Sequence, residues 1–290
     1  MKGETKMKKF LAVALALCMV FALVACGSQE PAPADPGEET PDYAANLVEA
    51  GKLTIGTTGG AAPFTYYDAN NNLVGYDIDI GNKLCEDLGL EPNFVALDWA
   101  GLLPGLQSGR FDVVLSGVTI TEERLNADGM ILSQPYDVNG VVILKKKGNT
   151  EINGWDDIQG KVLGCVAGST QVVMAEERLP EGTITEKREY PSWTEMLLDM
   201  ESGRIDYAIM DFLGPNYLML SGEANIEVIN DPIVLITQGV ATYSGEPELA
   251  AKIDELIGEY RESGLLEELI TKNFGGCLSF DLLETEEIAH

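Results

Sequence analysis

The chain has 290 residues, of which 45% are hydrophobic and 23% are charged, so it is long enough for one large or two medium globular domains. Its formal charge at pH 7 is −28, from 47 acidic and 19 basic residues. A field of this sign repels phosphate backbones, which argues against nucleic acid as a partner.

The first 25 residues have the pattern of a secretory signal peptide. Lys6, Lys8 and Lys9 form a positive start, and residues 10–23 form an apolar segment that is short for a membrane span. The tetrapeptide Leu-Val-Ala-Cys that ends at Cys26 resembles the bacterial lipobox. This resemblance implies a lipid on Cys26, which would become the mature N-terminus and anchor the chain to the membrane. The alternative is a plain secretory signal followed by an unrelated cysteine.

Residues 26–42 are rich in Pro, Glu and Gly and offer almost nothing to bury, so they are predicted to form a disordered tether. In an extended conformation the tether would reach about 50 Å. No later stretch approaches the roughly 18 apolar residues that a membrane span needs.

The positions of the remaining cysteines and of the only histidine bear on metal sites, disulfides and catalysis. Cys85, Cys165 and Cys277 are far apart and form no CxxC motif, so neither a metal site nor a disulfide framework is predicted. Cys85 and Cys165 fit buried hydrophobic positions, although one pair could form a disulfide in an oxidising envelope. His290 stands at the terminus, which argues against His-based catalysis and His-ligated metals. No cofactor is expected.

The folded part begins near Tyr43 with alternating strand and helix patterns. Strands are predicted over residues 52–57 and 93–96, and helices over residues 77–88 and 100–108. Residues 58–64 form a glycine-rich loop where backbone could approach a guest, and residues 66–75 fit a hairpin. This alternation is typical of an α/β fold.

The stretch of residues 106–124 and its partial repeat at residues 200–211 indicate the function. Each copy has a helix end, Ser-Gly-Arg, an Asp two residues later and an apolar strand. Ligands of open α/β sheets bind beyond the carboxyl ends of the strands, where one copy places Arg124 and the other Asp211. Together they fit a zwitterion with a carboxylate and an ammonium. The alternative is that Arg124 is a solvated surface residue and Asp211 a helix cap.

The second half restarts the pattern. Strands are predicted over residues 141–145 and 162–166, and a helix follows Gly168-Ser169-Thr170. Residues 247–274 have helical spacing and are expected to return to the first lobe. The predicted organisation is lobe 1 over residues 43–137 and 236–280, lobe 2 over residues 138–235, and a tail over residues 281–290. The chain would cross between lobes near residues 137–140 and 231–236.

Several motifs in order resemble family 3 of the bacterial extracellular solute-binding proteins, which serve polar amino-acid ABC transporters. They are APF from Ala62, GYDIDIGNKL from Gly75, DWAGLLPGLQSGRFD from Asp98, SGVTITEER from Ser116 and SGRIDYAIMD from Ser202. The resemblance covers about residues 53–275. It implies a two-lobed periplasmic-binding-protein type II fold, with a ligand cleft between lobes joined by two hinge strands.

The resemblance also implies roles for particular residues. Arg124 would pair with the α-carboxylate of the ligand, assisted by Thr119 and by Thr170 beside Ser169. Asp211 would hold the α-ammonium, with a carbonyl from Gly117. The apolar wall would include Trp99 and Phe64.

Three positions depart from the family pattern. Relatives that bind cationic side chains carry an acidic residue in place of Thr58 and an aromatic residue in place of Ala61, which argues against Lys, Arg or His as the ligand. Gly117 replaces a hydroxyl residue that is common in relatives, so fewer side-chain contacts to the ammonium are expected.

The predicted protein is therefore an extracytoplasmic amino-acid-binding lipoprotein that delivers its ligand to an ABC transporter permease by hinge closure. A monomer is the default, and no enzymatic activity is expected. Two alternatives stay open. One is a cyclohexadienyl-dehydratase-like enzyme on the same scaffold, for which Glu122 or Glu123 would have to supply acid–base chemistry. The other is a sensor lipoprotein that binds the same ligand and partners a receptor.

Overall fold

The computed structural model describes residues 42–275. The signal segment, Cys26, nearly all of the tether, Cys277 and the predicted tail lie outside the described residues. The short 3-10 helix η1 (Asp42–Ala44) opens the described part. No helix within it is long and apolar enough to cross a membrane.

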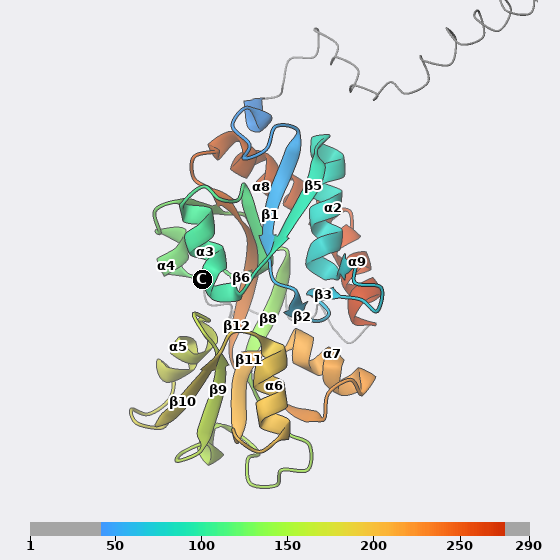
Figure 1. Ribbon diagram of the computed structural model, residues 1–290. Coiled ribbons are helices and arrows are strands. Elements are labelled where there is room, and N and C mark those ends of the chain that lie inside the picture. Colours follow the sequence, from blue (N-terminus) through green and yellow to red (C-terminus); the bar gives the residue numbers. More distant parts are fainter. Residues whose placement is uncertain (1–41, 276–290) are drawn as a thin grey trace, which may run out of the picture. The chain divides into compact units, whose positions relative to one another are not determined.

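The fold has two lobes built on the same plan (Figure 1). Each has three parallel strands connected through helices, as parallel pairing requires. The main elements of lobe 1 are β1 (Lys52–Thr57), α2 (Tyr76–Leu88), β5 (Glu91–Ala96), α3 (Trp99–Gln107) and β6 (Val113–Thr119). The main elements of lobe 2 are β9 (Val162–Val166), α5 (Gln171–Glu176), β10 (Glu186–Tyr190), α6 (Trp193–Glu201), β11 (Tyr207–Asp211) and α7 (Leu213–Ser221).

Two long strands join the lobes. They are β8 (Asp137–Lys146) and β12 (Ile226–Tyr243), which pair antiparallel with each other and give the sheet order β10-β9-β11-β8-β12-β6-β1-β5. The pairing is interrupted by a register shift between Ile229 and Val234. Beyond Gln238, β12 leaves β8 and continues along β6 into lobe 1. The strand thus changes partner later than the predicted crossing at residues 231–236.

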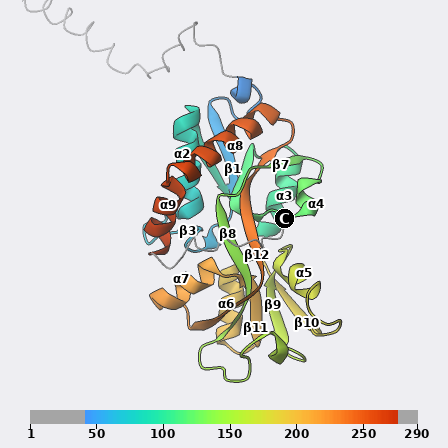
Figure 2. The ribbon, with the colours of Figure 1, turned by 180° about the vertical axis from the view of Figure 1, so that it is seen from behind.

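Smaller elements complete lobe 1, and its carboxyl-terminal helices return to it from the far end of the chain. Figure 2, which shows the molecule from behind, has α8 and α9 in front of the strands of lobe 1. The elements are the hairpin strands β2 (Gly60–Ala61), β3 (Thr65–Tyr67) and β4 (Leu73–Val74), then α4 (Glu122–Leu125), β7 (Met130–Leu132), α8 (Pro247–Glu262) and α9 (Leu265–Phe274). Residues of α8 and α9 share a hydrophobic core with β1 and α2, in the lobe to which residues 247–274 were expected to return.

The central strands are buried on both faces, which explains their continuous apolar sequences. In β6, Val113 and Leu115 pack with α2, α8 and α9, while Val114 and Val118 pack with α3. In lobe 2 the alternate residues of β8 and β11 divide between a core under α5 and a core under α6. In each lobe the sheet is therefore a layer with helices packed on both of its faces.

The two described cysteines lie in different cores and are free thiols. Cys85 is buried beside β1 in lobe 1, and Cys165 is buried in lobe 2. A Cys85–Cys165 disulfide is thus absent, and both act as small buried hydrophobes.

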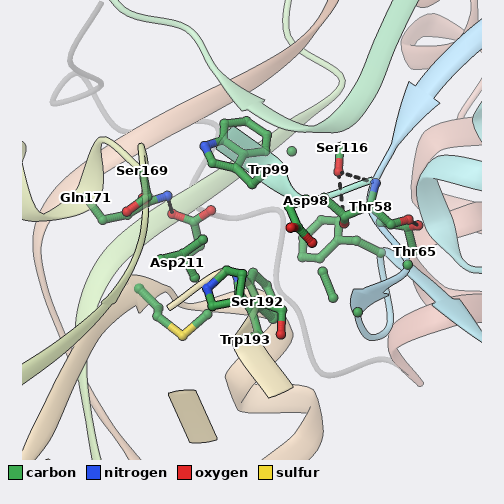
Figure 3. Close-up of a pocket in the computed structure, with 18 of the residues that line it drawn as sticks. Thr58, Thr65, Asp98, Trp99, Ser116, Ser169, Gln171, Ser192, Trp193 and Asp211 are labelled. Carbon is green, nitrogen blue, oxygen red and sulfur yellow. Dashed lines mark hydrogen bonds between the residues drawn. The ribbon is translucent and has the colours of Figure 1, made fainter. Parts of the chain in front are cut away.

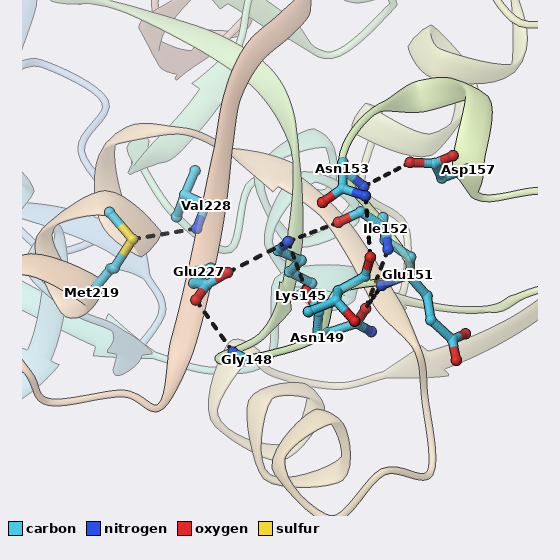
Figure 4. Close-up of polar contacts among 11 residues, drawn as sticks. Lys145, Gly148, Asn149, Glu151, Ile152, Asn153, Asp157, Met219, Glu227 and Val228 are labelled. Carbon is cyan, nitrogen blue, oxygen red and sulfur yellow. Dashed lines mark hydrogen bonds and ion pairs between the residues drawn. The ribbon is translucent and has the colours of Figure 1, made fainter.

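A buried lysine fixes the far end of lobe 2 (Figure 4). Lys145, at the end of β8, is 7% exposed, and its ammonium donates to the carbonyls of Asn149 at 2.9 Å and Ile152 at 2.8 Å. It also lies 3.4 Å from the carboxylate of Glu227 on β12. These contacts tie the loop before the 3-10 helix η2 (Trp155–Asp157) to both joining strands.

Candidate ligand-binding site

A cavity of about 310 Å³ lies where the carboxyl ends of the parallel strands of both lobes meet (Figure 3). This is the expected place for a ligand in an open α/β sheet, and the volume suits a small molecule. In lobe 1 its wall comes from the loops after β1 and β5, from the hairpin strand β3 and from the end of β6. In lobe 2 it comes from the loops after β9 and β10 and from the end of β11, and the joining strand β12 contributes Gln238.

Nearly all of the predicted site residues line this one cavity. Those from lobe 1 are Thr58, Ala61, Phe64, Trp99, Gly117 and Thr119, and those from lobe 2 are Ser169, Thr170 and Asp211. Arg124 is not part of the wall, but its guanidinium contacts two wall residues. The sequence thus predicted residues that the fold brings together from distant parts of the chain.

Arg124 is a buried cation without an ion pair to any of residues 42–275. It is 7% exposed, and its Nη1 donates to the carbonyl of Thr119 at 2.9 Å. Its guanidinium carbon lies 5.6 Å from the centre of the Trp99 ring, a cation–π distance. Thr121 caps the short helix α4 by accepting from the Arg124 amide, which fixes the backbone at this position. Because a buried charge without a counter-ion is costly, an anionic group bound beside Arg124 would be stabilised.

Asp211 is the corresponding buried anion, at the end of β11. It is 5% exposed and forms no ion pair within the described chain. Its two oxygens accept hydrogen bonds from the side-chain amides of Gln171 at 2.6 Å and Gln238 at 2.8 Å (Figure 3 shows the first). Burial raises its pKa to about 6, although the two amides and the nearby charge of Arg124 oppose that rise. The two glutamine amides hold the carboxylate in place, and no cationic side chain of residues 42–275 forms an ion pair with it.

The raised pKa of Asp211 predicts that ligand binding depends on pH. A ligand ammonium would pair with the ionised carboxylate, which is the minor form below pH 6. We expect the dissociation constant to rise about tenfold between pH 7 and pH 5, as linkage to one proton requires. Calorimetric titration of an amino acid that does not itself titrate in this range measures the effect. Asp211→Asn is expected to bind weakly with a flat profile, and a flat profile in the unmodified protein would contradict this role.

Gly117 has a backbone conformation that explains its departure from the family pattern. Its φ is 64°, in the left-handed region that side chains rarely adopt. A Cβ there would also come within 3.3 Å of the Gln238 amide. Its N–H donates to the hydroxyl of the buried Tyr136 at 3.1 Å. Gly117 thus leaves room for Gln238 to reach Asp211.

Two hydroxyl groups in the wall differ in their bonding. The Thr58 hydroxyl is hydrogen-bonded to the Ser116 hydroxyl, with 3.2 Å between the two oxygens. The Thr170 hydroxyl is buried and has no hydrogen-bond partner within the described residues. An orphaned buried hydroxyl is costly, so a ligand oxygen at Thr170 would satisfy it.

The lobes touch each other directly beside the cavity. The indole N–H of Trp99, in lobe 1, donates to the carbonyl of Gly168, in lobe 2, at 3.0 Å. The rings of Phe64 and Trp193 meet edge to face with centroids 6.3 Å apart. The structure therefore has the cleft closed.

The wall residues that were not predicted include Gln171, Gln238 and Trp193. The internal repeat could have revealed Trp193, because Trp99 and Trp193 stand at the same spacing ahead of the two Ser-Gly-Arg motifs and begin α3 and α6. The two glutamines carry no charge pattern that marks them in the sequence.

The Asp of each repeat has a structural role. Asp112 accepts from the amides of Val48 and Thr54, and Asp206 accepts from the amide of Val162. Each carboxylate therefore ties the Ser-Gly-Arg turn to the first strand of its lobe.

Acid–base and metal-binding groups are sparse in this region. Glu122 and Glu123, the candidates for an enzymatic role, are exposed and do not line the cavity. Within residues 42–275 no three His, Cys, Asp or Glu side chains are placed to hold a metal ion.

This two-lobed architecture is the periplasmic-binding-protein type II fold. The chain belongs to the bacterial extracellular solute-binding proteins, family 3, which it matches over residues 53–276. Among its relatives, the L-cystine-binding protein TcyJ of Escherichia coli (strain K12) is 31% identical over 78% of this chain and 84% of that protein. The arginine-binding extracellular protein ArtP of Bacillus subtilis (strain 168) is 31% identical over 93% of this chain and 99% of that protein.

A solved structure supports the same fold. The ancestral amino-acid-binding protein AncCDT-1, a precursor of cyclohexadienyl dehydratase, has a TM-score of 0.69 and is 31% identical, covering 77% of this chain and 96% of that one. The named protein relatives reported above are binding proteins rather than enzymes.

Proposed function

We propose that the protein binds one free amino acid between its lobes and presents it to an ABC transporter permease. The observation that carries this proposal is a pair of buried, oppositely charged groups that form no ion pair with any of residues 42–275: Arg124 beside the cavity and Asp211 in its wall. An amino acid carries both complementary charges. The relatives that bind L-cystine and arginine support this ligand class.

In the proposed complex each lobe supplies part of the site. Arg124 and Thr119 of lobe 1, with Ser169 and Thr170 of lobe 2, hold the α-carboxylate. Asp211 holds the α-ammonium, and Gly117 offers its carbonyl. The aromatic rings of Phe64 and Trp99 cover the ligand, and Thr58 and Ala61 border its side chain. Because the ligand contacts both lobes, it stabilises the closed state, which the permease would recognise.

The proposal extends to the cellular setting. A lipid on Cys26 would hold the protein at the outer face of the cytoplasmic membrane, and residues 26–42 would act as the tether. One folded body on each tether suffices, so a monomer is expected.

A thermal-shift screen over the common amino acids, together with L-cystine, L-ornithine and L-citrulline, tests the function. A ligand at about 100 times its dissociation constant adds about 2.7 kcal/mol to the apparent stability. This corresponds to a rise in Tm of roughly 5–10 °C for a domain of this size. The proposal fails if the folded protein shows no shift with any of them. The enzymatic alternative predicts turnover of prephenate or arogenate, and we expect none.

A further inference from the structure

We propose that Asp98 selects amino acids that carry a second cationic nitrogen, an ammonium or a guanidinium, at the far end of the side chain. This inference rests on the proposed function, because it concerns the part of the same cavity that the α-carboxylate and α-ammonium leave unfilled. It names the class of ligand that the sequence alone disfavoured.

The position of Asp98 places a carboxylate in the cavity wall. Asp98 precedes α3 at its N-cap position, yet its side chain does not cap the helix. Ser192 holds the same position before α6 and does accept from the backbone amide of Glu195. An Asp at an N-cap normally makes this bond. The Asp98 carboxylate is instead directed into the space that it shares with Asp211 and Trp193 (Figure 3).

The charge of the wall is one-sided. Among its residues only Asp98 and Asp211 are charged, and both are acidic. Asp211 accepts from two glutamine amides, whereas Asp98 forms no side-chain hydrogen bond or ion pair with any residue from 42 to 275. Once the ligand ammonium is paired with Asp211, Asp98 stays without a partner. Asp98 is exposed to water, so a neutral side chain that covered it would remove water from an uncompensated charge, which disfavours binding.

The apolar part of the wall suits a cation as well. Tyr67 and Trp193 line the cavity together with Phe64 and Trp99. Aromatic faces attract ammonium and guanidinium groups, as the contact between Arg124 and Trp99 already shows in this molecule. A carboxylate among aromatic rings is therefore a subsite for a positively charged group.

Asp98 also bears on the expectation, drawn from Thr58 and Ala61, that the ligand has no cationic side chain. Relatives that bind cationic side chains are expected to carry an acidic residue at position 58, whereas Thr58 is neutral and bonded to Ser116. Asp98 brings a carboxylate from a different element, the start of α3, to the same cavity. Asp98 thus supplies the carboxylate that position 58 lacks, and the subsite for a cationic group lies at the start of α3.

Calorimetric titration of the purified protein with matched ligand pairs tests the inference. L-arginine is compared with L-citrulline, which has nearly the same shape and no side-chain charge, and L-lysine is compared with L-norleucine. We expect at least one cationic probe to bind, with L-arginine or L-lysine at least tenfold tighter than its neutral partner. In Asp98→Asn this preference is expected to fall at least tenfold, while the affinity for the neutral partner changes less than threefold.

The control is Asp156→Asn, which removes the same charge from an exposed position outside the cavity and is expected to change neither affinity. The inference is overturned if neutral partners bind as tightly as cationic ones, or if Asp98→Asn weakens both equally. Binding of uncharged amino acids alone also overturns it and leaves the proposed function intact. Binding of no amino acid at all contradicts the proposed function itself.

Discussion

Replacing Arg124 by alanine is expected to weaken amino-acid binding by at least about thirtyfold, or ~2 kcal/mol. The ligand carboxylate would enter a closed cleft without the buried guanidinium that neutralises it. Truncating one member of a desolvated charge pair costs this much or more, because the remaining charge is left unpaired. Calorimetric titration with the tightest ligand of the screen measures the loss.

The unliganded Arg124→Ala protein is expected to be as stable as the unmodified one, since the substitution removes a buried charge that has no ion pair within residues 42–275. This separates loss of binding from unfolding. Arg110→Ala is the matched control, because Arg110 is exposed and outside the cavity wall. Arg124→Lys is expected to recover only part of the affinity, since lysine lacks the planar fork. An unchanged dissociation constant in Arg124→Ala would remove Arg124 from the site.

Replacing Phe274 by alanine is expected to destabilise the protein by about 3–5 kcal/mol. Phe274 ends α9 and is fully buried. The centroid of its ring lies 5.0 Å from that of Phe64, 5.8 Å from that of Tyr76 and 6.4 Å from that of Tyr217. The substitution opens a cavity in the core that supports the cleft wall. Urea unfolding would give the free-energy loss, and the Tm is expected to fall by roughly 10 °C.

Two variants calibrate this result. Phe274→Leu keeps most of the volume and is expected to lose less stability, and Leu220→Ala, at a position that is 60% exposed, is expected to change stability by less than about 0.5 kcal/mol. If Phe274→Ala lowered the free energy of unfolding no more than Leu220→Ala does, Phe274 would not pack in the core of lobe 1 as described.

The strands that were predicted most accurately have purely local signals. Residues 52–57 and 162–166 have the same bounds as β1 and β9, because each is a short apolar run bounded by polar or turn residues. The end of α2 was also marked locally, since Gly89 adopts the left-handed conformation that ends a helix. The helix predicted over residues 100–108 is α3, shifted by one residue.

The strand β12 was only partly predicted, because long-range pairing determines it. Its 18 residues include the polar segment around Asp231 and Pro232, where its register on β8 shifts. Neither half has a local pattern that reveals its partner. Lobe 2 therefore meets lobe 1 through a strand whose length could not be inferred from its own sequence.

The site was predicted through charge and resemblance, and the two glutamines that were missed are neutral. Arg124 and Asp211 stood out because opposite charges follow two copies of one motif. Gln171 and Gln238, which hold the Asp211 carboxylate, have no such signature. The sequence showed Asp98 only as part of a motif. The direction of its side chain depends on whether it caps α3, and the sequence does not reveal this.

The most direct test of the account is a crystal structure of the protein with the amino acid that binds most tightly. The account predicts one amino acid in the cavity, with its α-carboxylate within about 3.2 Å of the Arg124 guanidinium and its α-ammonium within the same distance of the Asp211 carboxylate. An amino acid bound outside this cavity, or bound in it without contact to either charge, would contradict the account.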